Sequence, residues 1–511
     1  MSTNLAPRDA DGYILDIPYV PCFNSRSTPV QVAMAARAAG VPAPDLEQPF
    51  RYADLGCGTG ITLLVLAAAY PDSQFFGIDI NEARIEEARA RAKRCGLANV
   101  QFIAGAFSSP AAQAIEDLDF ATAYGIYSWV SARVRGDLFA LLARSVKPDG
   151  LALVSYNTQA GYGQTVPVRD LMRRLIDGFP GDLNRRRRAA IDALHRMSRG
   201  SAPYFEQHPL ARALLADWQP VNFNYIVHEF LNESWYPASF GEVASDMAAV
   251  GFHFSGDSAY LLSGKPSWIA DHFEEIDDPV LLEDLTVFGN AHPFRVDVFS
   301  RQGPMAIGRP PLIHDEELFG TVWPAATRTM QQVAAKGDPT SALMKRCLSA
   351  PKRWGEIRRQ APLDGSMPAH AAAVLRDAMC ALTMTRYRSS LEVRPLNDTA
   401  VLSFSSKLSE DIANDRVLAD MPQFFPAPNV GGVVPVPPTI VQVIAAAEGQ
   451  SSRARWEERT LERLLVRAHG GEKPKGPDEM AALRERIERA ISQVQTTWAP
   501  FLAAAGILRS H

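Results

Sequence analysis

Apolar and polar positions along the first part of the chain form blocks that predict strands followed by helices. Residues 51–55 and 74–78 are short apolar runs typical of buried strands. Between them, residues 61–70 form an apolar stretch of about three helical turns, and residues 81–95 predict a second helix. Further elements of the same kind are strands over 100–104, 119–123 and 151–155 and a helix over 135–146. This alternation predicts an α/β fold with a doubly wound parallel sheet.

The alternation stops after residue 160 and resumes after residue 234. An amphipathic helix over 239–250 and strands over 251–255 and 294–299 supply the elements that were missing. We therefore predict a core formed by residues 50–160 and completed by residues 235–303. Residues 161–234 are predicted to form a helical insertion near the substrate edge, used for self-association or to cover the substrate. Its run Arg185 to Arg188 indicates a solvated helix face or a partner surface.

The two ends of the chain differ from this core. Residues 1–49 form an arm that contains a helix over 29–39, started by Thr28 and Pro29 and ended by Gly40. Residues 304–400 are mostly helical and close with short strands over 385–387 and 391–393, which predicts a winged-helix-like domain. A Pro/Gly-rich break over 427–438 precedes another helical stretch, over 439–508, in a C-terminal domain of residues 401–511.

Composition narrows the class of protein. The 511 residues carry a formal net charge of −5, so nucleic acid is an unlikely partner. The five cysteines are scattered without a Cys-x-x-Cys pair, so neither a metal site nor a disulfide framework is expected. The polar N-terminus has no signal-peptide core, and the longest apolar run is too short to span a bilayer. We expect a soluble cytoplasmic protein with no membrane partner.

The densest chemical signal is the glycine loop Asp54-Leu55-Gly56-Cys57-Gly58-Thr59-Gly60. Glycines at every second position allow positive φ and let the backbone lie against a ligand at a helix N-terminus. A dinucleotide fingerprint would need glycine at 61, where Ile61 stands, and a phosphate loop would need Gly-Lys-Ser/Thr. Asp79 ends the next strand, nineteen residues after Gly60, where a carboxylate can bind ribose hydroxyls. Acidic-x-Gly-x-Gly-x-Gly followed by a strand-end acid resembles class I S-adenosylmethionine-dependent methyltransferases.

Additional motifs extend the resemblance over residues 13–300. They are Tyr13…Asp16-x-Pro18-Tyr19, Tyr124-Gly125-x-Tyr127-Ser128-Trp129-Val130, Val154-Ser155-Tyr156-Asn157-Thr158, His228-Glu229-Phe230-Leu231-Asn232 and Phe294-Arg295-x-Asp297-Val298-Phe299. The chain is thus similar to bacterial methyltransferases with a methyltransferase regulatory domain, which include protein lysine methyltransferases of outer-membrane antigens. The resemblance implies S-adenosyl-L-methionine as cofactor, an arm over it, a helical dimerisation insertion, and a homodimer.

Site residues follow from the motifs and the strand ends. The predicted cofactor-binding residues are Tyr19, Asp54, Gly56, Cys57, Gly58, Gly60, Asp79, Ile80, Ala106, Phe107 and Tyr124. Many relatives place an acid for the adenine amino group after the third strand, but here Ala106 and Phe107 stand. We therefore expect backbone groups and Phe107 packing to hold adenine. Aromatic side chains after the fourth and fifth strands predict the acceptor mouth, with Tyr127, Tyr156 and Trp129 as catalytic residues. Core packing is the alternative for Trp129.

Three functions compete. The first is a protein lysine N-methyltransferase, the second a small-molecule O- or N-methyltransferase, and the third a cofactor-binding interaction protein without catalysis. Methylation of adenine or glutamine amides is disfavoured, since it would need Asn/Asp-Pro-Pro-Tyr where Tyr124-Gly125-Ile126-Tyr127 stands.

Overall fold

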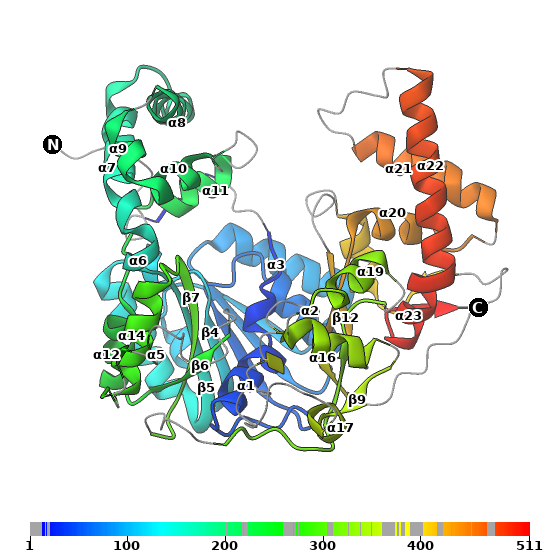
Figure 1. Cartoon of the computed structure of the whole chain (residues 1–511), viewed down its shortest axis with the longest axis horizontal. Helices are drawn as coiled ribbons and strands as arrows, with labels where there is room; N and C mark the ends of the chain where they lie inside the picture. The colour runs from blue at the N-terminus through cyan, green and yellow to red at the C-terminus, as the bar shows by residue number, and fades with distance from the viewer. Residues whose placement is uncertain are drawn as a thin grey trace.

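A seven-stranded sheet with the order β3-β2-β1-β4-β5-β7-β6 forms the centre of the molecule (Figure 1). Strands β1 to β5 pair in parallel, while β7 runs antiparallel to both β5 and β6. The computed structural model describes residues 13–15, 17, 21–200, 202–216, 218, 223–258, 269, 272–273, 275–276, 278–303, 310–324, 327–337, 339–348, 350–359, 374–375, 378–379, 384–388, 402–415, 423–430, 432–450, 452–467 and 476–510.

The predicted elements of this core are present with shifted ends, so the predicted α/β fold is confirmed. The strands are β1 (Arg51–Leu55), β2 (Gln74–Asp79), β3 (Val100–Ala104), β4 (Leu118–Ala123), β5 (Val146–Asn157), β6 (His253–Asp257) and β7 (Phe294–Ser300). The helices are α1 (Pro29–Ala38), α2 (Ile61–Ala69), α3 (Glu82–Cys95), α4 (Pro110–Gln113), α5 (Ala132–Ser145), α12 (Phe240–Ala249) and α14 (Pro279–Gly289). Short 3₁₀ turns occur at η1 (Ser25–Ser27) and η2 (Tyr127–Trp129).

Local sequence explains where these helices begin and end. The Asn81 side chain accepts a hydrogen bond from the Arg84 backbone N–H at the start of α3, and Gly96 ends that helix in the left-handed conformation. Ser239 and Glu242 form a capping box at the start of α12. Because each strand alternates its side chains between two faces, Tyr52 packs with the cluster that contains α1 to α3, and Ala53 with the cluster that contains α5 and α12.

Residues between β5 and α12 form the predicted helical insertion. Its elements are α6 (Gln159–Tyr162), η3 (Gly163–Thr165), α7 (Val166–Gly178), α8 (Leu183–Arg199), α9 (Pro203–Gln207), α10 (Pro209–Ala216) and α11 (Phe223–Phe230). They share a core of their own, to which Ile14 and Ile17 of the N-terminal arm contribute. The arginine run on α8 is not uniformly solvated: Arg187 is 1% exposed, and Arg188 stacks on the Phe223 ring at 3.9 Å. A charge run on an amphipathic helix therefore includes inward positions.

The C-terminal part covers the side of the sheet next to α2 and α3 (Figure 1). An ion pair of 2.8 Å joins Arg91 of α3 to Asp411 of α19. The helices are α15 (Arg328–Ala334), α16 (Pro339–Cys347), α17 (Trp354–Arg359), α19 (Lys407–Asn414), α20 (Pro438–Ala447), α21 (Arg453–Arg467), α22 (Pro477–Gln493), the π-helix η5 (Val494–Trp498) and α23 (Ala499–Ala504). The strands are β8 (Leu318–Thr321), β9 (Lys352–Arg353), β10 (Met384–Tyr387), β11 (Leu402–Phe404), β12 (Gln423–Ala427), β13 (Gly432–Val436) and β14 (Leu508–Ser510).

Two expectations for this part need correction. The segment read as a Pro/Gly break is the hairpin β12–β13, in which Phe424 pairs with Pro435 across antiparallel strands. Strand β8 precedes the middle helices and joins β9 and β10 in a three-stranded sheet, whereas the sequence predicted strands only after these helices. The predicted strand over 391–393 lies outside the described residues, and the winged-helix-like assignment and the domain boundaries stay predictions. No helix in the described ranges is long and apolar enough to cross a lipid bilayer.

Candidate active site

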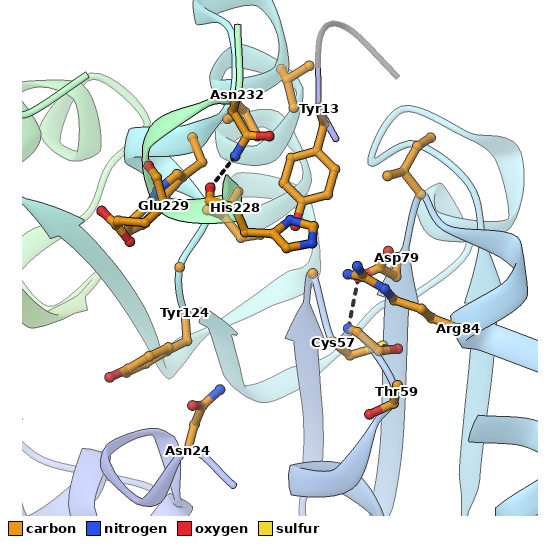
Figure 2. Close-up of a pocket in the computed structure, with 18 of the residues that line it drawn as sticks. Tyr13, Asn24, Cys57, Thr59, Asp79, Arg84, Tyr124, His228, Glu229 and Asn232 are labelled. Carbon is orange, nitrogen blue, oxygen red and sulfur yellow. Dashed lines mark hydrogen bonds between the residues drawn. The ribbon is translucent and has the colours of Figure 1, made fainter. Parts of the chain in front are cut away.

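A cavity of about 810 Å³ lies beyond the carboxyl ends of β1, β2, β4 and β5, in the size range of small-molecule sites. Parallel sheets of this kind bind ligands at this edge. The glycine loop, the end of β2 and the turn after β3 form one part of its wall, which we call the cofactor end: Gly56, Gly58, Asp79, Ile80, Ala106 and Phe107. The other part, which we call the acceptor end, consists of Tyr124, Trp129, Asn157, Tyr225 and Glu229. Figure 2 shows residues of both ends.

The glycine loop is held in place by the neighbouring strand. The backbone N–H groups of Gly56 and Cys57 donate to the carbonyl oxygen of Ile78, at 2.7 and 3.0 Å. Gly56 has a φ of +91°, and a Cβ there would lie 2.1 Å from the Cδ1 atom of Ile126. Only glycine fits this position. The loop therefore presents backbone rather than side chains to the cavity.

Asp79 ties the loop to the end of β2. Its carboxylate oxygens accept hydrogen bonds from the backbone N–H groups of Gly58 and Asn81, each at 2.8 Å. Each oxygen keeps further lone-pair capacity for the two ribose hydroxyls of a nucleoside. Asp79 is 8% exposed, and the Arg84 guanidinium lies beside it in Figure 2. The geometry suits the ribose-binding role predicted for Asp79.

Most predicted cofactor residues line the cavity. Those at the wall are Gly56, Cys57, Gly58, Asp79, Ile80, Ala106, Phe107 and Tyr124. Asp54 and Gly60 do not line it. Asp54 lies buried below the loop, where it accepts a hydrogen bond from Thr122 Oγ1 at 3.3 Å and burial raises its pKa to about 7. Gly60 caps the start of α2 instead, and Tyr19 lies outside the described residues.

Two of the three predicted catalytic residues do not reach the cavity. The Tyr127 hydroxyl donates to Asp246 Oδ2 at 2.8 Å, and the Tyr156 hydroxyl donates to Asp297 Oδ2 at 2.6 Å. Both side chains are almost completely buried, at 1% and 0% exposure. Their hydroxyl groups therefore have carboxylate partners away from the cavity, which does not suit the amine-orienting role predicted for them. Trp129 does line the cavity.

The helical insertion supplies site residues that the sequence interpretation missed. Tyr225, His228, Glu229 and Asn232 line the cavity and come from α11 or the two residues after it. Asn157, at the end of β5, lines it too. All of these residues except Tyr225 belong to motifs noted in the sequence. The motifs are His228-Glu229-Phe230-Leu231-Asn232 and Val154-Ser155-Tyr156-Asn157-Thr158. These motifs supported the family resemblance, but the spacing of their residues did not indicate which residue has a chemical role.

The N-terminal arm closes the cavity beside the cofactor end. Ile14 N donates to Asn232 Oδ1 at 2.9 Å, and the Ile17 carbonyl lies 2.7 Å from His228 Nε2. Figure 2 places Tyr13 beside His228 and Asn232, between Glu229 on one side and Asp79 with Arg84 on the other. The arm is thus held by the insertion, in a position that suits the predicted cofactor cover.

Matches to family models agree with this architecture. Residues 53–150 match the family described as "Methyltransferase domain", and residues 222–301 match "Predicted methyltransferase regulatory domain". Residues 53–150 thus form a methyltransferase domain with the Rossmann-like class I fold, and S-adenosylmethionine is the cofactor of that domain. The second match covers α11, α12, β6, α14 and β7, so the last residues of the insertion and the closing elements of the sheet resemble a predicted methyltransferase regulatory domain.

Individual relatives cover different shares of the chain. An uncharacterized protein of Synechocystis sp. is 31% identical over 302 residues, which are 58% of this chain and 59% of that protein. A trans-aconitate 2-methyltransferase of Acidovorax sp. is 33% identical over 153 residues, 30% of this chain and 52% of that protein. The chain thus spans little more than half the length of these relatives. The structure of PKMT2 from Rickettsia typhi in complex with AdoHcy has a TM-score of 0.67 at 19% identity, covering 94% of this chain and 99% of PKMT2.

Proposed function

We propose that this chain transfers the methyl group of S-adenosylmethionine to an amine, and that this amine belongs to lysine side chains of proteins. The observation that carries the proposal is one continuous cavity, which joins the cofactor end to an acceptor end of aromatic rings and a buried carboxylate, Glu229. Cationic ligands are favoured over aromatic faces and beside carboxylates. Both the ammonium form of the acceptor and the methylated product are cations.

The same features disfavour acidic acceptors. A carboxylic acid or phosphate would bring a negative charge beside Glu229, which is 8% exposed and poorly screened by water. Arg84, which also lines the cavity, lies beside Asp79 at the cofactor end rather than beside Glu229 (Figure 2). The similarity to trans-aconitate 2-methyltransferases, which covers 30% of the chain, therefore supports a shared cofactor domain better than a shared acceptor.

The acceptor end reaches the protein surface, which favours a side chain as the acceptor. Tyr225 lines the cavity and is 43% exposed. A lysine side chain is long and narrow, so its amine can reach a buried group while its own main chain stays outside. The sequence resemblance to bacterial protein lysine methyltransferases supports the same choice.

We also propose that the helical insertion pairs two copies of the chain, as the sequence predicts. Met197 and Leu210 are among the apolar side chains exposed on its surface, at 39% and 43% exposure. Light scattering of the full chain tests this role. We expect the wild type to have the mass of two chains and the double variant Met197→Ser, Leu210→Ser to shift to the smaller mass of one chain. A variant with the same mass as the wild type would contradict the proposed surface.

Labelled cofactor tests the main proposal. The enzyme is incubated with [methyl-³H]S-adenosylmethionine and a protein extract, either untreated or treated beforehand with acetic anhydride to block lysine amines. We expect label in protein from the untreated extract and loss of that label after blocking. Label in small molecules alone would favour the small-molecule alternative. Tight cofactor binding without transfer to either fraction would favour the non-catalytic alternative.

A further inference from the structure

Glu229 is the carboxylate at the acceptor end of the cavity. Its carboxylate is buried at 8% exposure yet lines the cavity. Asn157 Nδ2 donates to Glu229 Oε1 at 2.6 Å, and Trp129 Nε1 donates to the Glu229 backbone carbonyl at 3.1 Å. Asn157 is the last residue of β5 and Trp129 follows β4, so two side chains from the sheet edge hold the glutamate of α11 in place.

A carboxylate in this setting is poised to receive a proton from a cation. Burial raises the pKa of Glu229 to about 7, while the side-chain hydrogen bond from Asn157 acts in the opposite direction and lowers it. A buried carboxylate without a cationic partner costs free energy, and a ligand that brings an ammonium group offsets that cost. The aromatic rings of Tyr124 and Tyr225 line the same part of the cavity and can hold a cation over their faces.

We infer that Glu229 binds the ammonium group of the acceptor and takes its proton before the methyl group is transferred. This inference rests on the proposed function. The acceptor R–NH₃⁺ gives one proton to the Glu229 carboxylate and becomes R–NH₂. Its nitrogen lone pair then forms the N–C bond to the cofactor's methyl group, while the S–C bond breaks and its electron pair stays on sulfur. The products are R–NH₂⁺–CH₃ and S-adenosylhomocysteine, and Glu229 passes its proton to solvent.

The cofactor itself offers a rival for this carboxylate, because its methionine part carries an ammonium group. Figure 2 places Glu229 and Tyr124 on one side of the cavity and Asp79 with Arg84 on the other. The rival predicts that loss of the carboxylate weakens binding of every ligand with a methionine part. Our inference predicts that it weakens only ligands that also carry an amine at the acceptor position.

Two synthetic analogues separate these outcomes without knowledge of the natural acceptor. Both replace the sulfur of S-adenosylhomocysteine by nitrogen; one carries an aminoethyl arm, the other a propyl arm of the same length. Calorimetry compares both analogues and S-adenosylhomocysteine on wild type, Glu229→Gln and Glu233→Gln. Glu233 is a matched control, because it lies four residues further on and is exposed. We expect wild type and Glu233→Gln to prefer the aminoethyl arm by about 10-fold or more, and Glu229→Gln to lose this preference.

The results also distinguish failure of this inference from failure of the proposed function. An aminoethyl preference that persists in Glu229→Gln overturns the assignment of Glu229, and so does weaker binding of S-adenosylhomocysteine itself. No binding of S-adenosylhomocysteine to wild type overturns the proposed function instead. If Glu229→Gln does not fold, Glu229→Asp decides. This variant keeps the carboxylate but moves it one methylene group away from the acceptor position. A preference for the aminoethyl arm equal to that of wild type would therefore contradict the inference.

Discussion

The cofactor end and the acceptor end of the cavity are built in different ways. The cofactor end is built from residues within 56–107, a stretch that presents backbone amides and one strand-end acid to the cavity. The acceptor end combines side chains from the carboxyl end of β5 and from the segment after β4 with side chains of α11, more than sixty residues further along the chain. A backbone-built site depends on local sequence, whereas a site built from distant side chains depends on how an inserted helix is placed. Variants at the two ends should therefore fail in different ways.

The largest expected effect is at the cofactor end. Asp79→Ala removes the carboxylate that we predict to bind the ribose hydroxyls, and it removes the acceptor of the Gly58 N–H. Loss of charge-assisted hydrogen bonds costs about 1.5–3 kcal/mol, so cofactor affinity should fall about 10- to 150-fold. Calorimetry with S-adenosylmethionine measures it. Glu82→Ala is the control, because Glu82 is an exposed acid in the first turn of α3. Wild-type affinity in Asp79→Ala would remove Asp79 from the site.

The acceptor end should appear in the pH dependence of stability. Burial raises the pKa of Glu229 from 4.5 to about 7, so between these values the folded state binds a proton that the unfolded state has lost. The free energy of unfolding should therefore fall as pH rises from about 5 to about 8, by about 3 kcal/mol at most. Glu229→Gln should lack this contribution.

Denaturant titrations at pH 5 and pH 8 measure the difference between the two proteins. Asp54, whose pKa burial also raises to about 7, contributes equally to both and cancels in the comparison. Parallel curves for wild type and Glu229→Gln would show that Glu229 does not change its ionisation on folding.

A third variant tests a residue that belongs to neither end. Tyr156→Phe removes the hydrogen bond from the hydroxyl to Asp297, which keeps its ion pair with Arg295 at 2.6 Å. The free energy of unfolding should fall by about 1–2 kcal/mol, while turnover per folded molecule stays at the wild-type value. Denaturant titration and a methyl-transfer assay check the two parts. Reduced turnover with unchanged stability would restore the catalytic role that the sequence predicted.

The smallest expected effect concerns the arm. Asn232→Ala removes the acceptor of the Ile14 N–H and the donor to the His228 carbonyl. Each bond contributes about 0.5–1.5 kcal/mol, and only part of that sum reaches the cofactor, so affinity for S-adenosylmethionine should fall about 3- to 10-fold. Calorimetry measures it beside the exposed control Glu233→Ala. An effect larger than that of Asp79→Ala would mean that the arm, rather than the sheet, dominates cofactor binding.

The sequence predicted the sheet, the order of its elements and most of the cofactor end, because strand ends and glycine positions are local properties. It could not predict which face of β5 points to the cavity. Side chains alternate along a strand, so a shift of one residue puts Asn157 at the cavity and Tyr156 on the opposite side, against Asp297. Glu229 was missed for another reason. Helical periodicity shows that α11 has an apolar face but not that the helix lies over the ends of β4 and β5.

Strand β7 has a consequence for how the chain folds as it is synthesised. It lies between β5 and β6 although it comes last in sequence, pairing Asn157 with Phe294 at one end. The edge of β5 therefore stays unpaired while the 136 residues between these two are made, for about 7–27 s at common ribosomal rates. Exposed strand edges are templates for aggregation. The insertion helices, which are completed during that interval, emerge at the time when the nascent sheet most needs protection.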